Sequence, residues 1–167
     1  MLVTSKEANK ILHELEMELN HLVSDEEQAK TFLAAVGEDV ESCRPNYNYE
    51  ESQSAIKAVE NKIVKLKHAI NKFNTETVVD GFDKTIDEML IYISQLTQRS
   101  NKLNVMQNKL PKTREEFHLR SNVIDYRYVN YDIDKVKQDY KSTVDELHKA
   151  QIALDTVNVT KQFEINI

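Results

Sequence analysis

The stretch NYEESQSAIKAVENKIVKLKHAINKFNTET, residues 48–77, decides the fold of this chain. Its apolar residues recur at steps of three and four, the seven-residue repeat that places one continuous apolar seam along a helix. The seam consists of Ile56, Val59, Ile63, Leu66, Ile70 and Phe73. Lysines and glutamates occupy the other positions, so the stretch predicts a helix that packs on partner helices and does not span a membrane.

The helix that precedes this stretch begins at Thr4, which forms a T-x-x-E capping box with Glu7. Its apolar positions keep heptad phase as far as Val36, so we expect one helix up to that residue. Gly37 is well placed as the left-handed residue that ends it. A loop that contains Pro45 then leads into the quoted stretch.

Two further helical segments follow the quoted stretch. The third predicted helix starts at Thr85 and ends before Pro111, and the fourth runs from Asp132 or Asp134 to Asn158. We therefore expect a mainly α fold, a single domain of four helices in long antiparallel hairpins that pack as a coiled-coil-like bundle. The domain covers residues 1–167, and the hairpins cover residues 1–77 and 85–160.

In two segments outside the helices, the side chains alternate with the period of two that is typical of β-strands. Residues 122–131 read NVIDYRYVNY and are rich in β-branched and aromatic side chains, and the tail 161–167 reads KQFEINI. Because an isolated strand is not stable, we expect these two segments to pair as a short β element. The alternative for residues 122–131 is a mobile ligand-binding loop.

The formal net charge of −6 is concentrated in the first half of the chain. Residues 1–80 hold 9 Lys and Arg against 15 Asp and Glu, whereas residues 81–167 hold 13 of each. An acidic half argues against nucleic acid as the main partner, because phosphate binding relies on clustered cations. The start MLVTSKEANK lacks the features of a signal peptide, and we expect a cytoplasmic protein with no transmembrane segment.

Three groups of residues, spread over most of the chain, match a known family in order and spacing. They are INKFNTET at 70–77, Asp80-Gly81 with Thr85, and Leu154 with Asn158-Val159-Thr160. Together they resemble the septicolysin-like family, small bacterial helical proteins of unknown function. The residues that carry the resemblance, all with structural roles, are Asn71, Asn74, Thr75, Thr77, Gly81, Asn158 and Thr160. The chain departs from the family at Phe73, where a small polar residue is preferred, and at Val159, where Trp is preferred. The resemblance implies a bacterial helical hairpin protein, transfers no catalytic residue, and suggests a cytolysin through the family's name alone.

Two Glu-x-x-His pairs, Glu18 with His21 and Glu115 with His118, have the spacing found in di-iron helical bundles. The seam of the first helix directs His21 toward solvent, and the second pair lies beyond Pro111, outside a regular bundle. The chain also has no Gly-rich phosphate loop, no G-x-S-x-G and no CxxC motif. We therefore expect no enzyme and no catalytic, cofactor-binding or metal-binding residue.

The segment 109–131 interleaves cations with aromatic residues, a combination that single-stranded nucleic acid or a peptide edge would use. Its candidate interaction residues are Arg114, Arg120, Tyr126, Arg127, Tyr128 and Tyr131. The alternative is a purely structural strand whose tyrosines cover the end of the bundle and whose arginines pair with neighbouring acids.

The sequence therefore favours a non-enzymatic protein-protein interaction or scaffold protein that forms a homo-oligomer and binds an unidentified protein partner. Apolar residues on the flanks of the seams, among them Met17 and Ile152, stay partly uncovered in a single chain and favour self-association. A membrane-active cytolysin-like protein and a metal-binding helical bundle are the two alternative functions.

Overall fold

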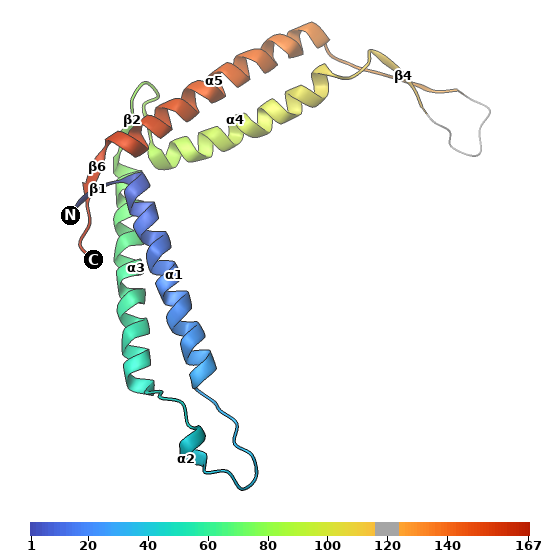
Figure 1. Cartoon of the computed structure of the whole chain (residues 1–167). Helices are drawn as coiled ribbons and strands as arrows, with labels where there is room; N and C mark the ends of the chain where they lie inside the picture. Colours follow the sequence, from blue (N-terminus) through green and yellow to red (C-terminus); the bar gives the residue numbers. More distant parts are fainter. Residues whose placement is uncertain (116–123) are drawn as a thin grey trace. The chain divides into compact units, whose positions relative to one another are not determined.

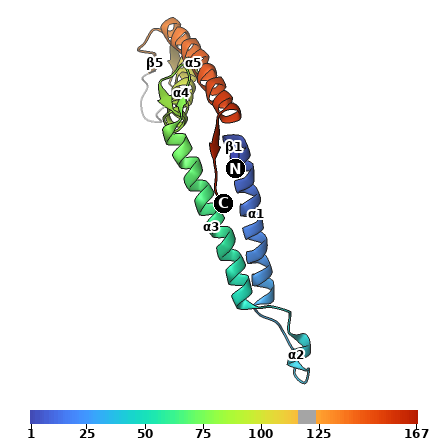
Figure 2. The ribbon, with the colours of Figure 1, turned by 90° about the vertical axis from the view of Figure 1, so that its left-hand side faces the viewer.

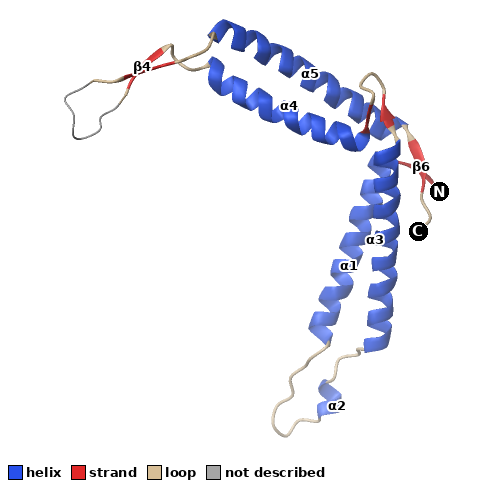
Figure 3. Ribbon diagram, turned by 180° about the vertical axis from the view of Figure 1, so that it is seen from behind, coloured by secondary structure: helices blue, strands red, loops and turns tan. Residues whose placement is uncertain are grey.

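The structure, a computed structural model, describes residues 1–115 and 124–167 and is mainly helical with small antiparallel strand pairs (Figures 1 and 3). The helices are α1 (Ser5–Ala29), α2 (Val40–Cys43), α3 (Tyr49–Glu76), α4 (Ile86–Gln107) and α5 (Ile133–Thr160). The strands are β1 (Leu2–Thr4), β2 (Val78–Val79), β3 (Lys84–Thr85), β4 (Lys112–Arg114), β5 (Tyr126–Tyr128) and β6 (Gln162–Glu164). The expectation of a mainly α fold with a minor β component is confirmed.

The chain divides into two compact units. The first unit holds residues 1–76 and 157–167, and the second holds residues 77–156. The single domain over residues 1–167 stays a prediction.

In the first unit, α1 and α3 lie side by side as a hairpin (Figures 1 and 2). All six seam residues of α3 are buried, and Leu66 has no exposed surface. Ala8 and Leu15 of α1 are buried against this seam, and Leu12, Leu19 and Leu22 pack around them. The apolar stripe predicted from the heptad spacing is therefore the core of this unit.

The tail completes that core by pairing with the start of the chain. Strand β6 runs antiparallel to β1, and Val3 lies opposite Phe163. Val3 and Ile165 join the buried cluster, and the ring of Phe163 stacks on Phe73 with 4.4 Å between centroids. The predicted pairing of the tail with residues 122–131 is wrong. Alternation identified the tail as a strand, but the core of the first hairpin decides which strand it joins.

Helix α1 ends at Ala29, seven residues before the predicted end at Val36. Its last turn has no basic residue, and the nearby carboxylates of Glu26 and Glu27 oppose the negative end of the helix dipole. The partner helix α3 begins only at Tyr49, so further turns of α1 would have no apolar surface to cover. Gly37 does adopt a positive φ of 96°, but in the loop and not at a helix end.

The second unit contains α4 and the part of α5 up to Thr156, which run alongside each other (Figure 3). Tyr92 of α4 donates a hydrogen bond to Glu146 of α5. Thr85, the predicted start of this helix, forms a capping box with Glu88 before α4. Just before it, β2 and β3 form a hairpin that buries Val79 completely.

Replacement of Leu66 tests the seam. Leu66→Ala should lower the free energy of unfolding by about 2 to 5 kcal/mol, because a large side chain with no exposed surface leaves a cavity. Val64, on the same helix but 66% exposed, supplies the control Val64→Ala, which should change stability by less than about 0.5 kcal/mol. Urea titrations followed by circular dichroism measure both values. Equal losses in the two variants would contradict the buried seam.

The pairing of the tail is tested at two neighbouring positions of β6. Phe163→Ala should cost about 2 kcal/mol, because it removes a half-buried ring that stacks on Phe73. Glu164→Ala, at an exposed position of the same strand, should have little effect. Thermal melting compares the two variants, and a Phe163→Ala protein as stable as the wild type would contradict the docking of the tail.

Candidate functional site

Strands β4 and β5 form a two-stranded antiparallel ribbon in the connection from α4 to α5, beyond the ends of both helices (Figure 1). Lys112 lies opposite Tyr128, Thr113 opposite Arg127, and Arg114 opposite Tyr126. All six side chains are exposed. Residues 126–128 thus form a strand as the sequence predicted, but its partner is β4 and not the tail. We call residues 112–114 and 126–128 the β4–β5 ribbon.

Cations and tyrosines meet on one face of the β4–β5 ribbon. The Lys112 Nζ atom lies 3.9 Å from the ring centroid of Tyr126 and 5.4 Å from that of Tyr128. On the other face, Arg127 donates to the carboxylate of Glu115, which raises the pKa of the Arg127 guanidinium above its ordinary value. The ribbon therefore presents a cation over an aromatic surface, an arrangement suited to contact with another molecule.

A hollow of about 540 Å³ lies at the base of the β4–β5 ribbon. We call it the ribbon hollow. Tyr131, which lines it, donates a hydrogen bond of 2.9 Å to the carbonyl oxygen of Met106 in the last turn of α4. The backbone N–H of Val129 donates to the Pro111 carbonyl at 3.2 Å, which continues the pairing of the two strands toward the helices. Its other lining residues include Lys109, Leu110, Thr113 and Arg127.

The structure brings five of the six predicted interaction residues to this region. Arg114, Tyr126, Arg127 and Tyr128 belong to the ribbon, and Tyr131 lines the ribbon hollow. The sixth, Arg120, lies outside the described residues. Part of the structural alternative is present as well, because Arg127 does pair with a neighbouring acid.

The two Glu-x-x-His pairs do not form a ligand cluster in the described part of the chain. Glu18 and His21 are exposed on α1, and Glu115 is engaged with Arg127. His118 lies outside the described residues. Among residues 1–115 and 124–167, no group of three or more His, Cys, Asp and Glu side chains could hold a metal ion. No helix in the same ranges is long and apolar enough to cross a membrane.

The residues that carry the family resemblance lie at helix ends and turns. The Thr75 hydroxyl donates to the Asn71 carbonyl at 3.1 Å, and the Thr77 carbonyl accepts from the Ile86 N–H at 3.0 Å. Gly81 has a φ of 85°, which the turn between β2 and β3 requires and which only glycine adopts without strain. Their positions fit structural roles. The remaining members are Asn74, at the end of α3, and Asn158 and Thr160, in the last turn of α5.

A second surface, which the sequence reasoning missed, is the connection between α1 and α3. Leu33 and Val36 follow the end of α1 and are almost fully exposed, with Leu33 at 96% of its possible surface. Unbroken heptad phase assigned both to a helix, so nothing in the pattern revealed their exposure. We call residues 25–51 the acidic tip, because they hold eight Asp and Glu against two Lys and Arg.

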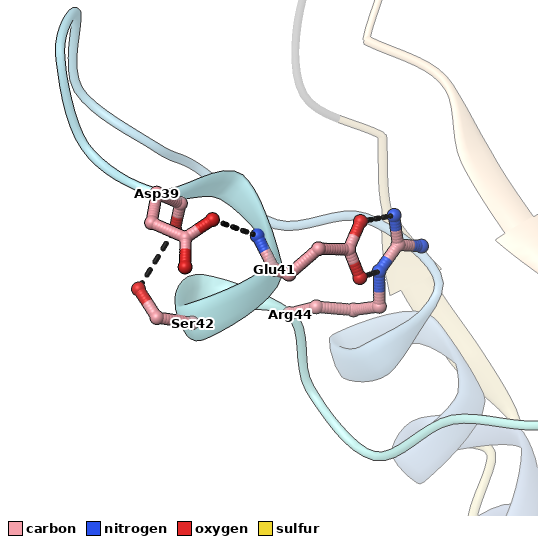
Figure 4. A network of polar contacts seen from close by, with 4 residues as sticks. All are labelled: Asp39, Glu41, Ser42 and Arg44. Atoms are coloured by element: carbon pink, nitrogen blue, oxygen red, sulfur yellow. Dashed lines mark hydrogen bonds and ion pairs between the residues drawn. The ribbon is translucent and has the colours of Figure 1, made fainter.

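Hydrogen bonds within the acidic tip order its backbone (Figure 4). Asp39 caps α2 by accepting from the Glu41 N–H at 3.2 Å, and its own carbonyl accepts from the Ser42 hydroxyl at 2.7 Å. Arg44 forms a two-point ion pair with Glu41, at 2.9 and 2.8 Å. Its guanidinium also lies 5.4 Å from the ring centroid of Phe32.

A further contact fastens the acidic tip to the helices. Glu26 near the end of α1 accepts from the Tyr47 hydroxyl at 2.7 Å and from the Gln53 amide of α3 at 2.8 Å. The bond from Tyr47 is the main cause of a lowered Glu26 pKa, and the same bond raises the pKa of Tyr47 to about 12. Leu33 and Val36 are therefore displayed by a connection that is hydrogen-bonded at both ends.

A known structure shares the fold of this chain. It is the crystal structure of a functionally unknown conserved protein from Corynebacterium diphtheriae, with a TM-score of 0.59 and 17% sequence identity over 98% of this chain and 100% of that one. No family model and no curated protein matches the sequence. At this identity the likeness concerns the fold alone.

Proposed function

We propose that this chain is a non-enzymatic protein-interaction protein that self-associates, and that the β4–β5 ribbon with the ribbon hollow is its recognition surface. The observation that carries the proposal is the exposure of all six ribbon side chains, with Lys112 held over Tyr126 and Tyr128. Aromatic and cationic side chains are the types that contribute most to protein interfaces.

The chemistry of the surface supports a protein segment as its ligand. A two-stranded ribbon offers backbone hydrogen-bonding groups along its edges, to which an extended segment can add. The ribbon hollow adds apolar lining from Leu110, Val129 and the ring of Tyr131. Nucleic acid fits less well, because the chain carries a net charge of −6 and one of the ribbon cations, Arg127, is already paired with Glu115.

The proposal also covers the packing of the helices and the family to which the chain belongs. The two hairpins would form a coiled-coil-like bundle of four long helices, and the chain would belong with the septicolysin-like proteins and act in the bacterial cytoplasm. The support is the heptad spacing of α3 and the turn residues from Asn71 to Gly81.

A membrane-active function is the second candidate, because Leu33 and Val36 are exposed apolar residues in a connecting segment. The excess of carboxylates around them would be repelled by anionic lipid, which places this candidate behind protein binding. Release of dye from liposomes by the purified protein would reverse that order. The metal-binding alternative predicts a stoichiometric metal in the purified protein.

The recognition role is tested by comparing two double variants. Lys112→Ala/Tyr128→Ala should raise the dissociation constant of self-association at least about tenfold, a loss of roughly 1.4 kcal/mol, because it removes the cation and one of its tyrosines. The control Lys102→Ala/Val105→Ala alters an exposed cation and an exposed apolar residue on α4 and should leave self-association unchanged. Light scattering after size-exclusion chromatography gives the mass of each protein.

Two results would contradict the proposal. A wild-type mass that stays at 19.4 kDa at high micromolar concentration would remove self-association, and equal assembly of both double variants would remove the role of the ribbon. Binding of a single-stranded oligonucleotide that depends on Lys112 and Tyr128 would assign the surface to nucleic acid instead.

A further inference from the structure

The acidic tip carries the whole charge excess of the protein. Its eight acidic and two basic residues differ by six, which equals the formal net charge of −6 for the chain. Both basic residues are engaged within the tip, Lys30 with Glu27 at 2.5 Å and Arg44 with Glu41. The remaining carboxylates surround Leu33 and Val36 along the sequence, so the tip combines exposed apolar side chains with uncompensated negative charge.

One of these carboxylates is fixed next to the apolar residues. Glu38 accepts a hydrogen bond of 2.8 Å from the Ala35 N–H, and its own N–H donates to the Ala35 carbonyl at 3.1 Å. This closed turn contains Val36 and Gly37, and its charge is held within it. Order of this kind lowers the conformational entropy that a binding segment loses on association.

The β4–β5 ribbon has the complementary character. Lys109, Lys112 and Arg114 form no ion pair with any residue in the described ranges, and all three are exposed. The ribbon hollow of about 540 Å³ has apolar lining from Leu110 and Val129, and Lys109 lines it as well. The Glu115–Arg127 ion pair completes the lining, whereas Lys112 and Arg114 lie on the other face of the ribbon. A ribbon that carries unpaired cations and adjoins an apolar hollow suits an acidic segment that displays aliphatic side chains.

We propose that the acidic tip of one copy of this chain docks into the ribbon hollow of a second copy. Leu33 and Val36 enter the hollow, and the carboxylates of Glu38 and Asp39 face Lys109 in its lining and the other cations of the ribbon. The inference rests on the proposed function and names the partner segment of the same surface. Because the two patches differ, the contact is heterologous, and each dimer keeps one free tip and one free ribbon for further copies unless a ring closes.

Two other binding partners would complement the charge of the tip less well. A tip-to-tip contact would bring two groups of uncompensated carboxylates together. A lipid surface with anionic headgroups would repel the same carboxylates. A ribbon of the same chain carries the opposite charge and an apolar hollow, so charge complementarity favours the second copy.

Complementation between two defective variants tests this contact. The tip variant Leu33→Ser/Val36→Ser removes apolar side chains at exposed positions. The ribbon variant Lys109→Glu/Lys112→Glu reverses the charge of two exposed cations, of which Lys109 lines the ribbon hollow. Each variant alone should stay monomeric, because every contact then lacks one functional surface. An equimolar mixture should form a heterodimer, with the intact ribbon of the tip variant bound to the intact tip of the ribbon variant. Sedimentation velocity gives the masses, and thermal melting checks that both variants are folded.

The outcomes separate this inference from the proposed function. A heterodimer whose dissociation constant rises at least about tenfold between 0.05 and 0.5 M salt would establish the contact. A tip variant that assembles like the wild type, beside a monomeric ribbon variant, would overturn the tip contact and leave the recognition role of the ribbon intact. A mixture that stays monomeric would also overturn it. If the wild type is monomeric and binds phosphatidylcholine vesicles through its tip, both proposals are wrong and the partner of the tip is a lipid surface.

Discussion

The burial of one narrow apolar stripe on α3 is the constraint on which the first unit depends. Its six residues are all buried, and four of them share one cluster with residues of α1, β1 and the tail. Phe73 stacks on Phe163 of β6. A helix in this unit is stable only where it has a partner to cover its stripe. Helix α3 begins at Tyr49, so α1 ends at Ala29, and the apolar residues that follow lose their cover. The exposed tip is thus a consequence of the lengths of the two helices.

Local signals predicted the helices well and the strand partners badly. Capping boxes at Thr4 and Thr85 mark two helix starts in the structure as they do in the sequence, because a cap involves only residues close in the chain. The partner of the tail depends on which surface is free near the end of α5, and periodicity carries no information about that. The same limit explains the error at Val36, where the heptad phase continued without a facing helix.

For the candidate site, too, the sequence showed some features and only the structure showed the others. The mixture of cations and tyrosines between Lys109 and Tyr131 was visible in the sequence, but the stacking of Lys112 on two rings required the register of β4 and β5. The acidic tip was invisible as a surface because its apolar residues fit a helical pattern. Charge could have drawn attention to it, since an excess of six acids within residues 25–51 favours a segment turned to solvent.

Disulfide trapping between two single-cysteine proteins tests the contact between tip and ribbon most directly. In a Cys43→Ser background, Val36→Cys labels the tip and Thr113→Cys labels the ribbon hollow. We expect mild oxidation of the mixed proteins to give a covalent dimer of one copy of each variant, and neither protein alone to give an efficient cross-link. A mixture that yields chiefly dimers of Val36→Cys with itself, or no dimer at concentrations where the wild type assembles, would contradict the account.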